Sequence, residues 1–255
     1  MGNRPKNLPT LPFDSPTVLT YRKQCQKGRE LEDVWSWYVL RRLSIYFAIL
    51  LSKRNVRPNA VTWISLLGMI AAGYSMAFAS PTSFLLAFVF YNIGYMSDCV
   101  DGEMARIQER TSRRGYFLDI LIQACSIPIF SSIGIALVEL HTGQALGALY
   151  AAVLYTVIVV ATMSLFIPIA LQLTQAKTEE VDPVKQIRVK SNFFEWVAFF
   201  TGLPGFFFVL LLLAACTLWI SLPIVWIKLF FTAFLGIFMA KAAVRLVITL
   251  SSIRD

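Results

Sequence analysis

Histidine is almost absent from this chain of 255 residues, which contains only His141. Its four cysteines, Cys25, Cys99, Cys125 and Cys216, show no paired spacing, so we expect ordinary reduced thiols and neither a disulfide framework nor a zinc site. Charged residues are also scarce, at 15% of the chain. An ordinary soluble domain carries about 25%. These shortages argue against a disulfide-rich protein, a zinc protein and an ordinary soluble domain.

Apolar residues take the place of the missing charges. Hydrophobic residues make up 57% of the chain, and the mean hydropathy is +0.64. A helix needs about 20 apolar residues to cross the hydrocarbon core of a bilayer. We therefore predict an all-α integral membrane protein with six transmembrane helices, near residues 61–80, 83–108, 115–138, 145–173, 201–220 and 223–249. The phenylalanine and leucine run over 206–213 is interpreted as lipid-facing.

The chain before the first span divides into two parts. Residues 1–28 are polar and contain four prolines, which predicts a flexible cytoplasmic arm and no cleavable signal peptide. Residues 29–55 combine apolar positions at helical spacing with charged ones, so we predict an amphipathic juxtamembrane helix with Trp35, Trp37 and Tyr38 at the headgroup level. The same stripe also suits packing on protein alone. Residues 56–255 form the predicted six-helix domain.

The formal net charge of +8 has a distribution that argues against nucleic acid as a partner. The basic residues gather in alternate connections between the apolar segments, and no recognition motif accompanies them. This asymmetry predicts a multi-pass membrane protein with both termini facing the cytoplasm. His141 falls in a turn on the opposite side.

Three carboxylates lie at the ends of two adjoining apolar segments, where ionisable groups are costly. Asp98 and Asp101 are three residues apart and share a helix face, and Asp119 arrives from the next helix. Gly102 permits close approach of a ligand, and Arg106 offers a fork of donors suited to phosphate. Oxygen ligands of this kind predict Mg²⁺ or Mn²⁺. A buried structural network of ion pairs is the alternative.

The spacing of these residues resembles the signature of the CDP-alcohol phosphotransferases, Asp-x-x-Asp-Gly-x-x-Ala-Arg, eight residues, then Gly-x-x-x-Asp-x-x-x-Asp. The chain matches every fixed position except the last, where Gln123 replaces the acid. The resemblance implies a homodimeric, metal-dependent membrane transferase in contact with membrane lipids, whose active site faces the cytoplasm. Such an enzyme moves a phosphoalcohol group from a CDP-linked alcohol donor, or CDP-diacylglycerol, to an acceptor alcohol or phosphate and releases CMP. The branch containing di-myo-inositol phosphate synthases looks nearest.

The resemblance also implies roles for individual residues. Asp98, Asp101 and Asp119 would hold metal, and the substrate-binding positions would be Asn59, Thr62, Gly102, Ala105, Arg106, Ser112 and Gly115. Each of the smaller residues has an alternative role. Asn59, Thr62 and Ser112 also suit helix capping, and the glycines and alanine also suit close helix packing.

Gln123 stands where the family has its general base, and an amide cannot accept a proton at ordinary pH. An acceptor with an already ionised oxygen needs no base, or another group or a metal-bound water takes the proton. Two further explanations are a catalytically silent relative that binds CDP-alcohol or acts as a scaffold, and an engineered substitution that traps substrate. We favour an active or diverged member because the other motif positions are intact.

The longest internal connection is a charged loop over 175–192, which emerges on the same face as the acidic motif. A solvated loop is the default interpretation. Lys185, Arg188 or Lys190 is also placed to help hold an anionic acceptor or a lipid headgroup.

Overall fold

The computed structural model describes residues 8–29, 32–143, 147–176 and 192–252, and in these ranges the regular elements are all helices. The elements are α1 (Pro16–Cys25), η2 (Ser36–Leu40), α2 (Arg41–Lys53), α3 (Pro58–Ala77), α4 (Pro81–Ile107), α5 (Arg113–Ala124), α6 (Ser126–Thr142), α7 (Gly147–Ala176), α9 (Asn192–Phe200), α10 (Leu203–Ile220) and α11 (Val225–Ser252). Element η2 is a single stretch of π-helix that leads directly into α2.

Six helical segments in the described ranges are long and apolar enough to cross a membrane. They correspond to α3, α4, the pair α5 and α6, then α7, α10 and α11. The third is one segment over Arg113–Thr142, which is divided into α5 and α6 at Cys125. The prediction of an all-α membrane protein with six spans is therefore confirmed.

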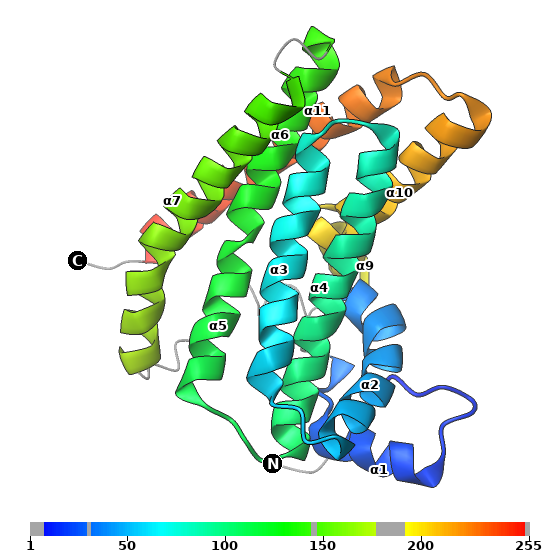
Figure 1. The fold of residues 1–255 in the computed structure, drawn as a ribbon, viewed down its shortest axis with the longest axis vertical. Coiled ribbons are helices and arrows are strands. Elements are labelled where there is room, and N and C mark those ends of the chain that lie inside the picture. The colour runs from blue at the N-terminus through cyan, green and yellow to red at the C-terminus, as the bar shows by residue number, and fades with distance from the viewer. Residues whose placement is uncertain (1–7, 30–31, 144–146, 177–191, 253–255) are drawn as a thin grey trace.

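Helices α3 and α4 run side by side through the middle of the molecule (Figure 1). Their axes approach closely at two glycines: a Cβ atom added to Gly68 would lie 2.8 Å from the Cα atom of Gly94. Any larger residue at either position would force the helices apart. A short turn before Pro81 joins them, so the start of α3, the end of α4 and the start of α5 meet at one end of the bundle.

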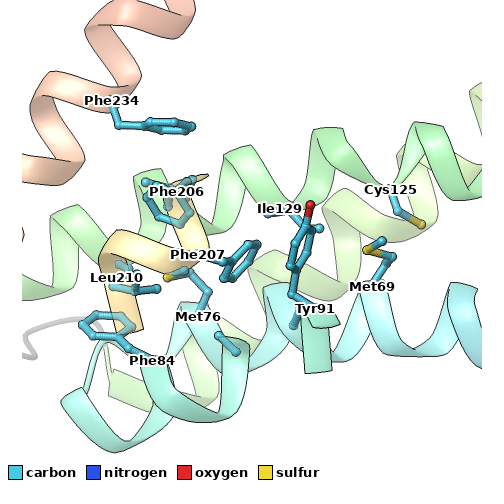
Figure 2. Close-up of a cluster of buried hydrophobic side chains, with 14 of the residues drawn as sticks. Met69, Met76, Phe84, Tyr91, Cys125, Ile129, Phe206, Phe207, Leu210 and Phe234 are labelled. Carbon is cyan, nitrogen blue, oxygen red and sulfur yellow. The ribbon is translucent and has the colours of Figure 1, made fainter. Parts of the chain in front are cut away.

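The core lies between these two helices and α6, α10 and α11, where aromatic and aliphatic side chains interdigitate (Figure 2). Phe206, Phe207 and Leu210 are fully buried, and the ring of Phe207 stacks on that of Tyr91 at 4.2 Å. The interpretation of 206–213 as lipid-facing is thus wrong for these three residues. Phenylalanine and leucine suit lipid and a protein core equally, and only the helix packing decides between the two.

The N-terminal segment also differs from its prediction. Residues 16–25 form α1, capped by Ser15, instead of a flexible arm. Arg22 on this helix is fully buried and donates hydrogen bonds to Asp14 and to two main-chain carbonyls of α2. Polar composition suggested disorder, but these polar groups satisfy one another inside the protein.

The predicted amphipathic helix is present from Val34 to Lys53, across η2 and α2. Trp37 is only 5% exposed, and Trp35 donates from Nε1 to Asn92 of α4 at 2.8 Å. Trp37 is therefore buried in protein and the headgroup role predicted for it is wrong, whereas the role predicted for the half-buried Trp35 and the exposed Tyr38 stays a prediction. The apolar side chains that do face outward are Tyr38, Leu43, Phe47 and Leu50.

Candidate functional site

A cavity of about 280 Å³ lies at the end of the bundle where α3, α4 and α5 meet. Asp98, Asp101 and Arg106 face it from α4, and Asp119 faces it from α5. Every residue predicted for the site lines this cavity except Gln123. The lining residues that the sequence predicted are Asn59, Thr62, Asp98, Asp101, Gly102, Ala105, Arg106, Ser112, Gly115 and Asp119.

The three aspartates are near enough for their negative charges to repel one another. No ion pair involves Asp98 or Asp101 in the described part of the chain, so the alternative of a closed ion-pair network does not apply to these two. Their oxygen donors fit a hard divalent cation. The side chains as placed do not form a cluster of three or more acidic, histidine or cysteine ligands within the described ranges. Metal binding therefore stays a prediction.

Thr62 and Asn59 reach the cavity from the first two turns of α3. Thr62 is buried, donates to the carbonyl of Pro58 at 3.2 Å and is a hydrogen-bonding neighbour of Asp101. Asn59 Oδ1 would be 3.5 Å from a Cβ atom added to Gly115, so it lies against the start of α5. Thr62 therefore supports Asp101 from the neighbouring helix.

Arg106 enters the cavity from the last turn of α4. Its Nε donates to the carbonyl of Cys25, and its Nη2 is buried without a hydrogen-bond partner in the described residues. A Cβ atom added to Gly102 would meet this guanidinium at 3.5 Å, an ordinary contact. Helix packing therefore does not demand glycine at position 102, in contrast to Gly68 and Gly94.

Ser112 has the capping role that the sequence offered as its alternative. Its hydroxyl accepts from the amide of Gly115 at 3.0 Å and so begins α5. The residue also lines the cavity, so one side chain ends the connection after α4 and borders the site.

Gln123 lies one turn beyond Asp119 on α5, exposed and away from the cavity lining. Its amide donates to Asp119 Oδ2 at 3.4 Å. The residue thus contacts one motif acid without facing the space that the others enclose. Lys185, Arg188 and Lys190, proposed for an anionic acceptor, lie outside the described residues.

Three cations at the cavity are absent from the sequence prediction: Lys27, Arg41 and Arg110. Arg41 pairs with Glu32 at 3.0 Å and with Glu103 at 3.1 Å. Glu103 is 62 residues from Arg41 in sequence. Glu32 is nearer, but it lies at a bend before the helix that carries Arg41. No local pattern distinguishes Arg41 from its neighbour Arg42, so only tertiary packing identifies it.

A second cavity of about 300 Å³ lies between residues 32–34, α4, α9 and the start of α10 and contains none of the motif residues. Its polar side chains already have partners: Asp33 accepts from Tyr95, and Glu195 pairs with Arg29. The acidic cavity is therefore the better candidate for chemistry.

Comparison with known proteins shows which family the chain resembles. The sequence model of the CDP-alcohol phosphatidyltransferase family matches residues 55–238. A phosphatidylinositol phosphate synthase from Streptomyces avermitilis is 34% identical over 92 residues, 36% of this chain and 37% of that protein. An uncharacterized protein from Aquifex aeolicus is 31% identical over 103 residues, 37% of this chain and 51% of that protein. These matches thus span about half or less of each relative's length. No solved structure matches the chain.

Proposed function

This chain belongs to the CDP-alcohol phosphatidyltransferase family, and on that premise we propose that it is an active transferase of this type. It moves a phosphoalcohol group from a CDP-activated donor, either CDP-alcohol or CDP-diacylglycerol, to an acceptor alcohol or phosphate. An acceptor oxygen attacks the β-phosphorus of the donor, the bond from that phosphorus to the CMP oxygen breaks, and CMP leaves. The observation that carries the proposal is the single cavity lined by all the matching motif residues.

Binding of the donor falls to residues from two helices. Asn59 and Thr62 of α3 line the cavity together with Gly102 and Ala105 of α4. Small side chains at Gly102 and Ala105 let the nucleotide approach the α4 backbone. Arg106 has a buried Nη2 without a partner in the described part of the chain, which suits contact with a phosphate oxygen. These groups align the donor for in-line attack.

Asp98, Asp101 and Asp119 would hold Mg²⁺ or Mn²⁺ in this proposal. The ion, when bound, supplies positive charge that neutralises the phosphates. The support is the donor set itself: the carboxylates repel one another, and ion pairs to Asp98 or Asp101 do not occur in the described ranges. Mutual repulsion of this kind favours a bound cation.

The acceptor in this proposal carries an already ionised oxygen, such as that of a phosphate, because Gln123 cannot act as a base. The cations at the cavity, including Lys27 and Arg110, support an anionic acceptor. The active site and both termini face the cytoplasm, as the basic residues at this end of the bundle favour. The family resemblance supports a homodimer in the membrane.

Purified protein in detergent, supplied with Mg²⁺, tests the proposal by measuring CMP. The donors are CDP-diacylglycerol, CDP-glycerol and CDP-inositol, each combined with a panel of alcohols and phosphates. We expect CMP release that requires both substrates, stops with EDTA, returns with Mg²⁺ and is lost in Asp101→Asn. Glu109→Gln is the matched control, because Glu109 is exposed and outside the cavity. Absence of CMP release from every pair would overturn the proposal.

Gln123 favours a second candidate, a catalytically silent relative that binds CDP-alcohol or serves as a scaffold. A Gln123→Asp variant that gains CMP release over a silent parent would establish it. A wild-type protein that already turns over would exclude it.

A further inference from the structure

Lys27 reaches the acidic cavity from a part of the chain that the family match does not include. The match begins at residue 55, whereas Lys27 follows α1 in the N-terminal segment. The side chain nevertheless lines the cavity together with Asp98 and Arg106. Its positive charge acts on the Asp98 carboxylate. The N-terminal segment is thus part of the wall of the site.

Lys27 and Arg110 differ from the other two cations of the cavity wall, because neither has a side-chain partner in the described ranges. Arg41 is occupied by Glu32 and Glu103, and Arg106 donates to the carbonyl of Cys25. Lys27 is exposed and makes no ion pair or hydrogen bond through its side chain to any described residue. An exposed ammonium group on the wall of such a cavity suits a phosphate oxygen.

The two residues before Lys27, Cys25 and Gln26, are held in place by hydrogen bonds. The carbonyl of Cys25 accepts from Arg106 of α4. The side-chain amide Nε2 of Gln26 donates to Glu103 Oε1 at 2.9 Å and to the main-chain carbonyl of Arg41 at 2.7 Å. The two residues before Lys27 are therefore bonded directly to the motif helix.

A fully buried arginine secures the same segment from within α1. Arg22 donates to Asp14, to Gln26 Oε1 at 3.1 Å and to the carbonyls of Arg41 and Arg42 at 3.0 Å. Buried polar networks of this kind rigidify a segment when their members are satisfied. Arg22 and Gln26 thus hold the end of α1 against α2 and α4.

We propose that Lys27 binds a phosphate oxygen of the substrate at the wall of the cavity, and that Gln26, with Arg22 and Glu103, is the positioning network that holds it there. The identity of the phosphate rests on the proposed function. It belongs either to the pyrophosphate of the donor or to an anionic acceptor, and the two sources share the same chemistry.

Equilibrium binding separates these sources without requiring turnover. Full-length wild-type protein and Lys27→Met are titrated with CDP in the presence of Mg²⁺, and separately with inorganic phosphate. Loss of the ammonium group weakens the affinity for the bound phosphate about tenfold, and Lys27→Arg retains it within about threefold. A change in the CDP arm assigns Lys27 to the donor, and a change in the phosphate arm alone assigns it to the acceptor.

Lys23→Met is the matched control, because Lys23 is an exposed lysine on α1 that does not line the cavity. Its affinity for both probes stays at the wild-type value. Equal affinities of Lys27→Met and Lys23→Met in both arms would overturn the proposal, as would wild-type protein that binds neither probe. Binding that responds to Lys27→Met without CMP release from any substrate pair would support Lys27 while overturning the proposed turnover.

The positioning role of Gln26 is tested by a double-mutant cycle. Gln26→Leu alone weakens the affinity for the same probe about threefold, since Lys27 is then less well placed. In the Lys27→Met background the same change has no further effect. Additive losses would show that Gln26 acts only on overall stability and would overturn its positioning role.

Discussion

Two groups of acidic residues lie close together at one end of the bundle and have opposite surroundings. Glu103 of α4 accepts hydrogen bonds from Gln26, Arg41 and Ser44 and is fully buried. Asp101, two residues earlier on the same helix, lines a cavity and feels the charges of two other aspartates. Residues two apart on a helix point in different directions. One helix thus serves both a structural network and a binding site.

The difference between these acids lies in how their charge is compensated. The negative charge of Glu103 is neutralised by Arg41 inside the protein, so Glu103 does not need a cation from solution. Asp98 and Asp101 have no ion pair in the described part of the chain, so their repulsion can be relieved by a cation from solution. Substitutions at these acids, at Asp14 and at Gln123 should therefore differ in their effects on activity and stability.

Asp101→Asn should have the largest effect, a loss of CMP release of more than about 100-fold, because the variant removes a carboxylate that would hold the divalent cation that neutralises the phosphates. Its thermal unfolding midpoint in detergent should stay the same or rise, since repulsion from Asp98 and Asp119 is removed. A variant that unfolds earlier than wild type would show that this acid is structural.

Glu103→Ala should lower stability instead, by about 3 kcal/mol, because it removes the buried acceptor shared by Gln26, Arg41 and Ser44 and leaves the charge of Arg41 balanced by Glu32 alone. Chemical unfolding in detergent measures the change. The matched control is Glu109→Ala, an exposed acid near the end of the same helix, which should unfold like the wild type. Equal unfolding of the two variants would refute a structural role for Glu103.

Asp14 is an acid paired with Arg22, so the contribution of such a pair to stability can be tested by changing the pH. Burial raises the pKa of Asp14, but hydrogen bonds from Arg22 and Tyr46 outweigh it, and the pKa lies below its ordinary value. The stability from this lowered pKa is complete above the unfolded carboxyl's pKa of about 3.9 and is lost as the pH falls through the lower folded value. Asp14→Asn should cost about 2 kcal/mol at pH 7, and the difference from wild type should shrink below pH 4. A difference that does not depend on pH in unfolding measurements would contradict this.

Gln123→Ala should have the smallest effect, with CMP release within about threefold of wild type. Gln123 is exposed, lies outside the cavity lining and makes one long hydrogen bond to Asp119. Steady-state measurement of CMP decides the point. A loss comparable to that of Asp101→Asn would place Gln123 within the reacting group of residues.

Much of this molecule was predictable because its signals are local. A run of about 20 apolar residues predicts a span wherever it occurs. Asp98, Asp101 and Gly102 identify the family by spacing alone, and the cavity then contains the matching positions. Ser112 was correctly offered as a cap because capping depends on residues three apart.

The errors concern side chains whose partners are distant. Arg22 belongs to a segment whose polar composition predicts disorder. The side chain is nevertheless buried and donates to carbonyls 19 and 20 residues away. Trp37 and Phe207 carry no local mark that separates a protein contact from a lipid contact. Lys27 and Arg41 were not predicted for the site for the same reason.

The six spans, the acidic motif and the family follow from the sequence alone, because hydropathy and spacing along one chain are enough to define them. Which acids pair with arginine and which line the cavity depends instead on the tertiary packing. It also decided that the N-terminal segment forms part of the cavity wall. Those outcomes depend on contacts between α1, α2 and α4. The free energy of these contacts depends on burying and pairing charged groups that are far apart in sequence.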